Sequence, residues 1–99
     1  MAQFDVYGGF GDPDGYVVNL QTDQLDYLAV RVVAPLIPKD SAPPISRLTP
    51  VVHFQGAEYL LLSHQLAPVP VRELHRPIGS LYADQDVIKR ALDFLFFNN

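Results

Sequence analysis

Short apolar segments separated by turn-forming residues fill most of the chain, and this spacing constrains the fold more than any other feature. Glycine and proline recur between the segments, and proline cannot donate the backbone hydrogen bond that a central strand or a helix interior needs. One helical pattern closes the sequence. Five or six short strands followed by one helix predict a mainly β protein, a small barrel or sandwich with the helix packed at one end.

The expected strands are recognised by alternating or continuous runs of apolar and β-branched residues. They span residues 3–7, 16–21, 27–36, 48–54, 58–63 and 66–71. Pro35 and Pro38 are expected to confine the end of the third strand to a sheet edge or a bulge. Pro68 and Pro70 limit the last strand to an edge for the same reason. The connection Gln55-Gly56-Ala57 predicts a tight hairpin between the fourth and fifth strands.

Three connections are expected to be irregular. Residues 8–15 are rich in glycine and contain the turn sequence Asp12-Pro13-Asp14-Gly15. Residues 39–47 form a surface loop, which Pro43-Pro44 stiffens and keeps from becoming helical. Residues 72–82 are expected to be a further loop that leads into the helix.

The closing segment, residues 84–99, predicts a short helix. One of its faces is apolar and consists of Val87, Ile88, Ala91, Leu92 and Leu95. Phe97 falls on the opposite, charged face. A large aromatic side chain in that place suits a contact with another molecule. Fraying of the helix, with Phe97 folded back on the domain, explains the pattern equally well.

Composition limits the classes of function. The chain has 99 residues, which suits one domain spanning 1–99. Its net charge of −4, without a dense Lys/Arg run, disfavours a protein held mainly by nucleic-acid phosphates. It has no cysteine, so a disulfide framework and a thiolate metal site are excluded. The longest apolar runs are far shorter than the ~20 residues of a membrane span, so we expect a soluble cytoplasmic protein without membrane association.

The polar residues do not indicate an enzyme, and no catalytic residue, metal or cofactor is predicted. His53, His64 and His75 are eleven residues apart, which matches no metal-ligand spacing. His53 is expected to face solvent or a partner strand. The arginines could cluster in space, but surface positions are the default expectation for all of them: Arg31, Arg47, Arg72, Arg76 and Arg90.

Several short motifs, in the same order along nearly the whole chain, resemble the CcdB family of toxins. The most specific is Pro50-Val51-Val52-His53, the family's PVVH segment. The other matching pieces are Gln3-Phe4-Asp5-Val6-Tyr7, Gln21-Thr22-Asp23 with Asp26, Val33-Ala34-Pro35-Leu36, Val69-Pro70-Val71, and Ile88-Lys89, Ala91 and Phe96 in the closing helix. Each piece alone is weak, and their shared order carries the resemblance.

The resemblance implies an SH3-like, partly open barrel, with a main antiparallel sheet, a small second sheet and one C-terminal α-helix. It implies a homodimer whose C-terminal ends meet at the interface. It further implies a poison, not an enzyme, that inserts this end into the GyrA subunit of DNA gyrase and traps gyrase on cleaved DNA. A CcdA-like antitoxin would neutralise the toxin and join it in repressing their operon, so that the toxin contacts DNA only indirectly.

The gyrase-binding residues implied by the resemblance are Asp93, Phe96, Phe97, Asn98, Asn99, Gln24 and Leu25. The chain departs from its relatives at this end. Phe97 replaces a tryptophan, so an aromatic face remains but the indole N–H is lost. Asn98 replaces a glycine and Asn99 a β-branched apolar residue. Loss of that last apolar contact corresponds to about 1.5–3 kcal/mol of binding free energy.

Two alternatives stay open. The chain could be a CcdB-like, antitoxin-binding homologue whose target is lost or altered. It could also be an endoribonuclease like the MazF/Kid toxins, which share this barrel. That activity needs an arginine with a hydroxyl or acidic partner, and Arg47 with Thr49 is the one candidate pair.

Overall fold

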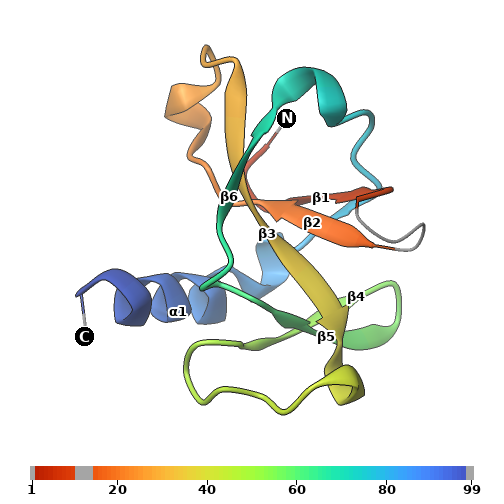
Figure 1. Cartoon of the computed structure of the whole chain (residues 1–99), viewed down its shortest axis with the longest axis vertical. Helices are drawn as coiled ribbons and strands as arrows, with labels where there is room; N and C mark the ends of the chain where they lie inside the picture. The colour runs from red at the N-terminus through yellow and green to blue at the C-terminus, as the bar shows by residue number, and fades with distance from the viewer. Residues whose placement is uncertain (1, 11–14, 98–99) are drawn as a thin grey trace.

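A computed structural model of the chain describes residues 2–10 and 15–97, and it shows a strongly curved antiparallel sheet with one C-terminal helix (Figure 1). The strands are β1 (Asp5–Gly8), β2 (Tyr16–Asn19), β3 (Val30–Pro38), β4 (Val51–Phe54), β5 (Ala57–Leu61), β6 (Ala67–Pro70) and β7 (Gly79–Ser80), and the helix is α1 (Gln85–Phe97). Along the sheet the strands follow the order β4-β5-β3-β2-β1-β7, and β6 branches off β3. The sheet curls into a nearly closed barrel, which confirms the predicted fold class.

The long strand β3 is the centre of this arrangement. Along one edge it pairs with β2, where Leu36 lies opposite Tyr16. Along its other edge it pairs with β5 through Leu36 and Leu61, and with β6 through Val33 and Ala67. One strand therefore joins the β4–β5 hairpin to the rest of the barrel (Figure 1).

Pro35 was expected at a sheet edge or a bulge. β3 is not an edge strand, but Pro35 has a ladder partner only in β2, because β5 pairs with residues 36–38 and β6 with residues 30–33. The carbonyl of Pro35 accepts the N–H of Leu62 at 3.0 Å. The nitrogen and carbonyl of one strand residue point to the same edge, so the missing N–H of Pro35 faces the break between β5, which ends at Leu61, and β6, which begins at Ala67. Proline is tolerated inside this strand because its neighbour is interrupted there. β3 ends at Pro38, two residues after the predicted end at Leu36.

The β4–β5 hairpin has the predicted tight reversal. Phe54 pairs with Ala57, so the loop is the dipeptide Gln55-Gly56. Both loop residues have positive φ, +51° at Gln55 and +78° at Gly56. Two successive residues of this kind define the turn that matches the natural twist of a hairpin.

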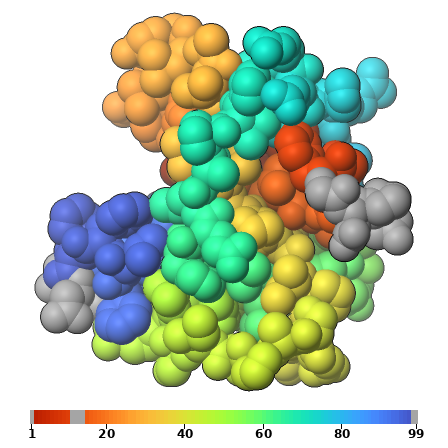
Figure 2. Space-filling model, in the orientation of Figure 1, coloured from red at the N-terminus to blue at the C-terminus, as the bar shows by residue number. Residues whose placement is uncertain are grey.

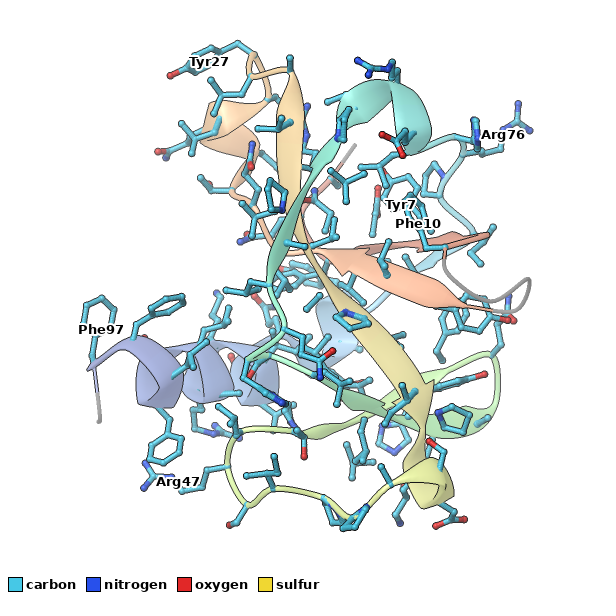
Figure 3. The ribbon with its side chains drawn as sticks, in the orientation of Figure 1. Tyr7, Phe10, Tyr27, Arg47, Arg76 and Phe97 are labelled. Carbon is cyan, nitrogen blue, oxygen red and sulfur yellow. The ribbon has the colours of Figure 1, made fainter. Side chains whose placement is uncertain are left out.

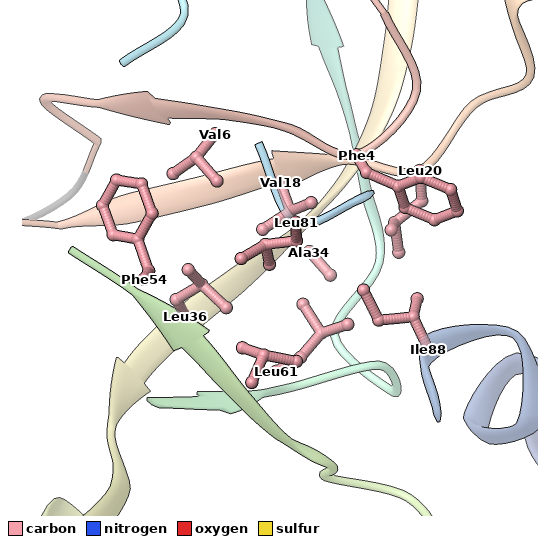
Figure 4. Packing of buried hydrophobic residues seen from close by; sticks show 11 residues of the cluster. Phe4, Val6, Val18, Leu20, Ala34, Leu36, Phe54, Leu61, Leu81 and Ile88 are labelled. Carbon is pink, nitrogen blue, oxygen red and sulfur yellow. The ribbon is translucent and has the colours of Figure 1, made fainter. Parts of the chain in front are cut away.

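The main core lies inside the curved sheet and is closed by the helix (Figure 4). Its buried members are Phe4, Val6, Val18, Leu20, Ala34, Leu36, Val52, Phe54, Leu61, Leu81 and Ile88. Gly79 on β7 is required by close packing, since a Cβ at this position would lie 2.5 Å from Cε1 of Phe54. The aromatic rings of Tyr16 and Tyr59 make T-shaped contacts with the Phe54 ring, at 5.3 and 6.1 Å between centroids.

The boundaries of most elements differ from the predicted ranges by one to three residues, and two differences change the fold locally. β3 begins at Val30 instead of residue 27, because residues 22–29 form a separate loop. The predicted loop 72–82 contains the short strand β7, which pairs with β1. The predicted turn at residues 12–15 lies mostly outside the described residues.

Candidate functional site

The C-terminal end of α1 presents two aromatic side chains to solvent. One face of the helix is anchored, since Ile88 and Ala91 are buried while Val87 and Leu92 pack against the core. Phe96 and Phe97 then remain 59% and 70% exposed, with their ring centroids 6.4 Å apart. Phe97 does not fold back on the barrel, so the alternative interpretation of this residue is wrong (Figure 3).

Asp93 lies on the exposed side of α1, one turn before Phe97. It borders a pocket of about 530 Å³ between the helix and the loop that precedes β4. The pocket is lined by Arg47, Pro50, Val87, Arg90, Ala91 and Asp93. The remaining predicted site residues of this end, Asn98 and Asn99, lie outside the described residues.

Arg47 connects that loop to the helix. Its guanidinium carbon lies 4.3 Å from the centroid of the Phe94 ring, a cation–π contact. Arg47 also has a positive φ of +68°, which is uncommon for a residue with a side chain. The hydroxyl of Thr49 is buried, accepts the N–H of Ile45 at 2.8 Å and donates to its carbonyl at 3.2 Å. Arg47 and Thr49 are therefore each occupied with structural contacts.

Gln24 and Leu25 lie in a different part of the chain, in the short 3₁₀ turn Asp23–Leu25. Thr22 caps this turn, since its Oγ1 accepts the N–H of Gln24 at 3.4 Å. Both Gln24 and Leu25 are exposed. The turn and the end of α1 lie on the same side of the molecule (Figure 1), and Figure 2 shows the surface hollowed between them. Those predicted site residues that the structure describes thus lie on two elements that flank a recess, the Asp23–Leu25 turn and the end of α1.

Sequence reasoning missed the exposure of three apolar residues, two in this loop and one, Val30, at the start of β3. Tyr27 is 80% exposed, and Leu28 and Val30 are 37% and 39% exposed. The sequence pattern assigned them to a strand, in which part of them would be buried. The apolar run at 27–30 beside two aspartates contains no signal that separates an exposed loop from a strand.

The surface position expected for Arg31 is also wrong. The residue is 4% exposed, and its side chain binds the backbone of the 22–30 loop. Its partner Asp26 contributes a carboxylate oxygen 3.3 Å from Nη2. Pairing of this kind is what allows an arginine to be buried.

His53 lies between two carboxylates near the start of α1. Its Nε2 is 3.4 Å from Glu58 and its Nδ1 is 3.6 Å from Asp84. Its backbone N–H donates to the Asp84 carboxylate at 2.9 Å, which ties β4 to the segment leading into the helix. Lys39 donates to Glu58 at 3.2 Å, and this contact lowers the pKa of the Glu58 carboxyl. In residues 2–10 and 15–97, no three histidine or carboxylate side chains are placed to share a metal ion.

Comparison with known proteins adds one finding. The family model described as CcdB protein matches residues 3–97. No curated protein matches the chain in sequence. Among the described residues, no helix combines the length and the apolar character needed to cross a bilayer.

Proposed function

The chain belongs to the CcdB family of toxins from toxin–antitoxin pairs, and we propose that it acts by poisoning DNA gyrase. In this proposal the end of α1 binds the GyrA subunit and traps the enzyme on cleaved DNA. The toxin makes and breaks no bond in its target, so it is an inhibitor and not an enzyme.

The observation that carries this proposal is the exposed aromatic pair at the end of an anchored helix. Phe97 leaves 70% of its surface in contact with water, although the helix that bears it is fixed to the core by Ile88 and Ala91. Burial of an aromatic side chain of this size in a partner stabilises a complex by roughly 1.5–3 kcal/mol. A rigid support adds to this, because little conformational freedom is lost on binding.

The other proposed contacts surround this pair. Asp93 lies on the same helix, and Asn98 and Asn99 follow Phe97 in the sequence. Gln24 and Leu25 form a second contact across the recess (Figure 2). We propose that all of these residues meet GyrA.

We further propose the assembly that goes with this activity. The toxin is a homodimer whose two C-terminal ends act together. A cognate CcdA-like antitoxin binds and neutralises it, and the pair represses its own operon, so that contact with DNA runs through the antitoxin. The protein acts in the cytoplasm, where gyrase is found, and without a membrane partner.

A growth experiment tests the proposal. Expression of the chain in bacteria without antitoxin is expected to stop growth, and Phe97→Ser is expected to restore it. Tyr82→Ser is the matched control, because Tyr82 is an aromatic residue of similar exposure, 64%, on another element. The control variant should remain toxic.

Two outcomes would contradict the proposal. If Phe97→Ser still stops growth, the end of the helix is not the poison. If the unchanged chain leaves growth unaffected but binds its antitoxin tightly, it is a family member with a lost or altered target. The chain ending Phe97-Asn98-Asn99 is the feature that favours this second reading.

A further inference from the structure

We propose that Gln21 and Arg31 are positioning residues that hold segment 22–30 as a preformed apolar docking surface for the same GyrA partner. The docking surface consists of Leu25, Tyr27, Leu28 and Val30. This inference rests on the proposed function and extends its second contact, Gln24 and Leu25, to the exposed apolar residues that follow them.

The docking surface is unusual because it gathers exposed apolar side chains. Leu25 and Leu28 are each 37% exposed, Val30 is 39% exposed and Tyr27 is 80% exposed. They come from six consecutive positions, 25–30, at one corner of the molecule (Figure 3). Single exposed apolar residues are common, but a cluster of this kind marks an interaction site.

The buried side chain of Arg31 binds the backbone of this segment. Its Nη1 donates to the carbonyls of Leu28 at 2.7 Å and Val30 at 2.9 Å, and its Nη2 donates to the carbonyl of Asp26 at 2.9 Å. The carboxylate of Asp26 balances the charge at 3.3 Å. One buried guanidinium therefore fixes three carbonyls within five residues. Lysine cannot reproduce this fork of planar donors.

The side chain of Gln21 also binds the backbone of this segment. Its Nε2 lies 3.2 Å from the carbonyls of both Leu25 and Val30, while its Oε1 accepts the N–H of Val32 at 3.1 Å. Gln21 is buried, with an exposed fraction of 8%. Its amide therefore joins the loop directly to β3.

Two further hydrogen bonds connect the loop to other parts of the chain. The carboxylate of Asp23 accepts the N–H of Gln3 at 2.7 Å. The carbonyl of Ala29 accepts the N–H of Val71 at 2.9 Å. The backbone of the loop is thus bound to the N-terminal segment, to β3 and to the end of β6.

Burial of a charged side chain is costly unless its hydrogen bonds are made. Here the Nη1 and Nη2 groups of Arg31 have partners, although its buried Nε has none among the described residues. Together with Gln21 this side chain stabilises a loop whose apolar side chains are exposed. A loop fixed in this way loses little conformational freedom when it binds, which is the general advantage of a preorganised surface.

GyrA is the partner that fits, because the docking surface is continuous with the proposed gyrase site. Leu25 belongs to both. Tyr27 and Phe97 project from the same side of the molecule (Figure 3), and the recess of Figure 2 lies between their elements. The docking surface and the end of α1 lie on either side of this recess, so both can contact one partner surface at the same time. A second copy of this chain or the antitoxin are the other possible occupants, and the experiment separates them.

The first measurement compares GyrA binding by purified full-length variants. Tyr27→Ser and Leu28→Ser are each expected to weaken binding about tenfold. Tyr82→Ser, the exposed aromatic control, should bind like the unchanged chain. Self-association and antitoxin affinity should stay within about twofold of their original values. A loss in either of these, with GyrA affinity preserved, assigns the surface to that other occupant and overturns the proposal.

The second measurement tests positioning. Arg31→Lys is expected to speed hydrogen exchange at the amides of residues 25–30 while the core strands stay protected. It should also weaken GyrA binding about tenfold, and Tyr27→Ser should add little to this loss, because Arg31 acts through the surface that Tyr27 forms. Additive losses, or unchanged exchange in the loop, would show that Arg31 only stabilises the fold. If Arg31→Lys does not fold, Gln21→Met provides the same comparison.

Failure of this inference differs from failure of the proposed function. If Phe97→Ser abolishes GyrA binding and Tyr27→Ser leaves it intact, the helix end is the site and the docking surface is refuted. If the unchanged, folded chain does not bind GyrA at all, the proposed function and this partner assignment are both wrong.

Discussion

Tyr7 carries a buried hydroxyl group without a hydrogen-bond partner among the described residues. It lies in the second, smaller core with Val17, Val33 and Leu74. Because an unpartnered hydroxyl is costly to bury, Tyr7→Phe is expected to raise the free energy of unfolding by about 1 kcal/mol, or ~4–8 °C in melting temperature. Calorimetry of the two proteins measures this difference. A clear loss of stability would mean that the hydroxyl is satisfied.

The same residue predicts a pH effect of known sign. Burial, together with the charge of Asp5, raises the pKa of Tyr7 above its usual value of 10.0. The folded state then holds this proton more tightly than the unfolded state. Its contribution to stability is complete below pH 10 and is lost as pH rises toward the folded-state pKa. In urea titrations above pH 10, the unchanged chain should therefore lose more stability than Tyr7→Phe. Parallel curves for the two proteins would contradict this.

Gly79 has a steric role that a second substitution can reveal. A Cβ at this position would meet the ring of Phe54 at 2.5 Å. Gly79→Ala is expected to cost about 1–3 kcal/mol, the range for an overpacked core. Phe54→Leu removes the ring, so the double variant should lose less stability than the two single changes together predict. Chemical denaturation of all four proteins measures the coupling, and simple additivity would exclude the clash as the cause.

At the scale of elements, the β4–β5 hairpin offers a stabilising change. Gln55 has a φ of +51°, a region that asparagine occupies more readily than glutamine. Gln55→Asn creates the Asn-Gly pair that this turn favours and should stabilise the fold by about 0.5 kcal/mol. Thermal unfolding measures the gain. Gln55→Val, which is β-branched, is the opposite control and should destabilise the protein. Equal stability of both variants would contradict the turn assignment.

Most elements could be predicted from the sequence, because their signals are local. The helix stripe predicted the burial of Ile88 and Ala91, and the glycine at position 56 predicted the hairpin. The position of Pro35 inside a central strand could not be predicted. A proline is tolerated there only because the neighbouring strand is interrupted at residues 62–66. The short strand β7 was missed because its pairing with β1 is set by the closing of the barrel and not by its own residues.

The candidate site could be predicted only in part. Phe97 was marked by its position on the charged face of the helix, and the structure shows it exposed. The docking surface around Tyr27 had no such mark. A short apolar run predicts a strand. The sequence does not indicate that the side chains of Gln21 and Arg31 bind the backbone carbonyls of this segment. Long-range hydrogen bonds of this kind leave no periodic pattern in the sequence.

At the scale of the whole molecule, the barrel serves as a rigid support for two exposed apolar projections. The core anchors α1 through Ile88 (Figure 4). Buried polar side chains bind the backbone of segment 22–30. The exposed aromatic side chains at the end of α1 therefore contribute little to the stability of the fold. Since Phe97 is 70% exposed, its replacement by serine should change the free energy of unfolding by no more than about 0.5 kcal/mol.

An assay of trapped gyrase tests directly whether this chain poisons the enzyme. Purified gyrase and supercoiled DNA are incubated with the folded chain, and cleaved DNA with gyrase attached is scored after protease treatment. We expect cleaved DNA to accumulate with the unchanged chain, and to fall about tenfold or more with Phe97→Ser at the same concentration. Absence of cleaved DNA with the unchanged chain, or equal trapping by both proteins, would contradict the central claim.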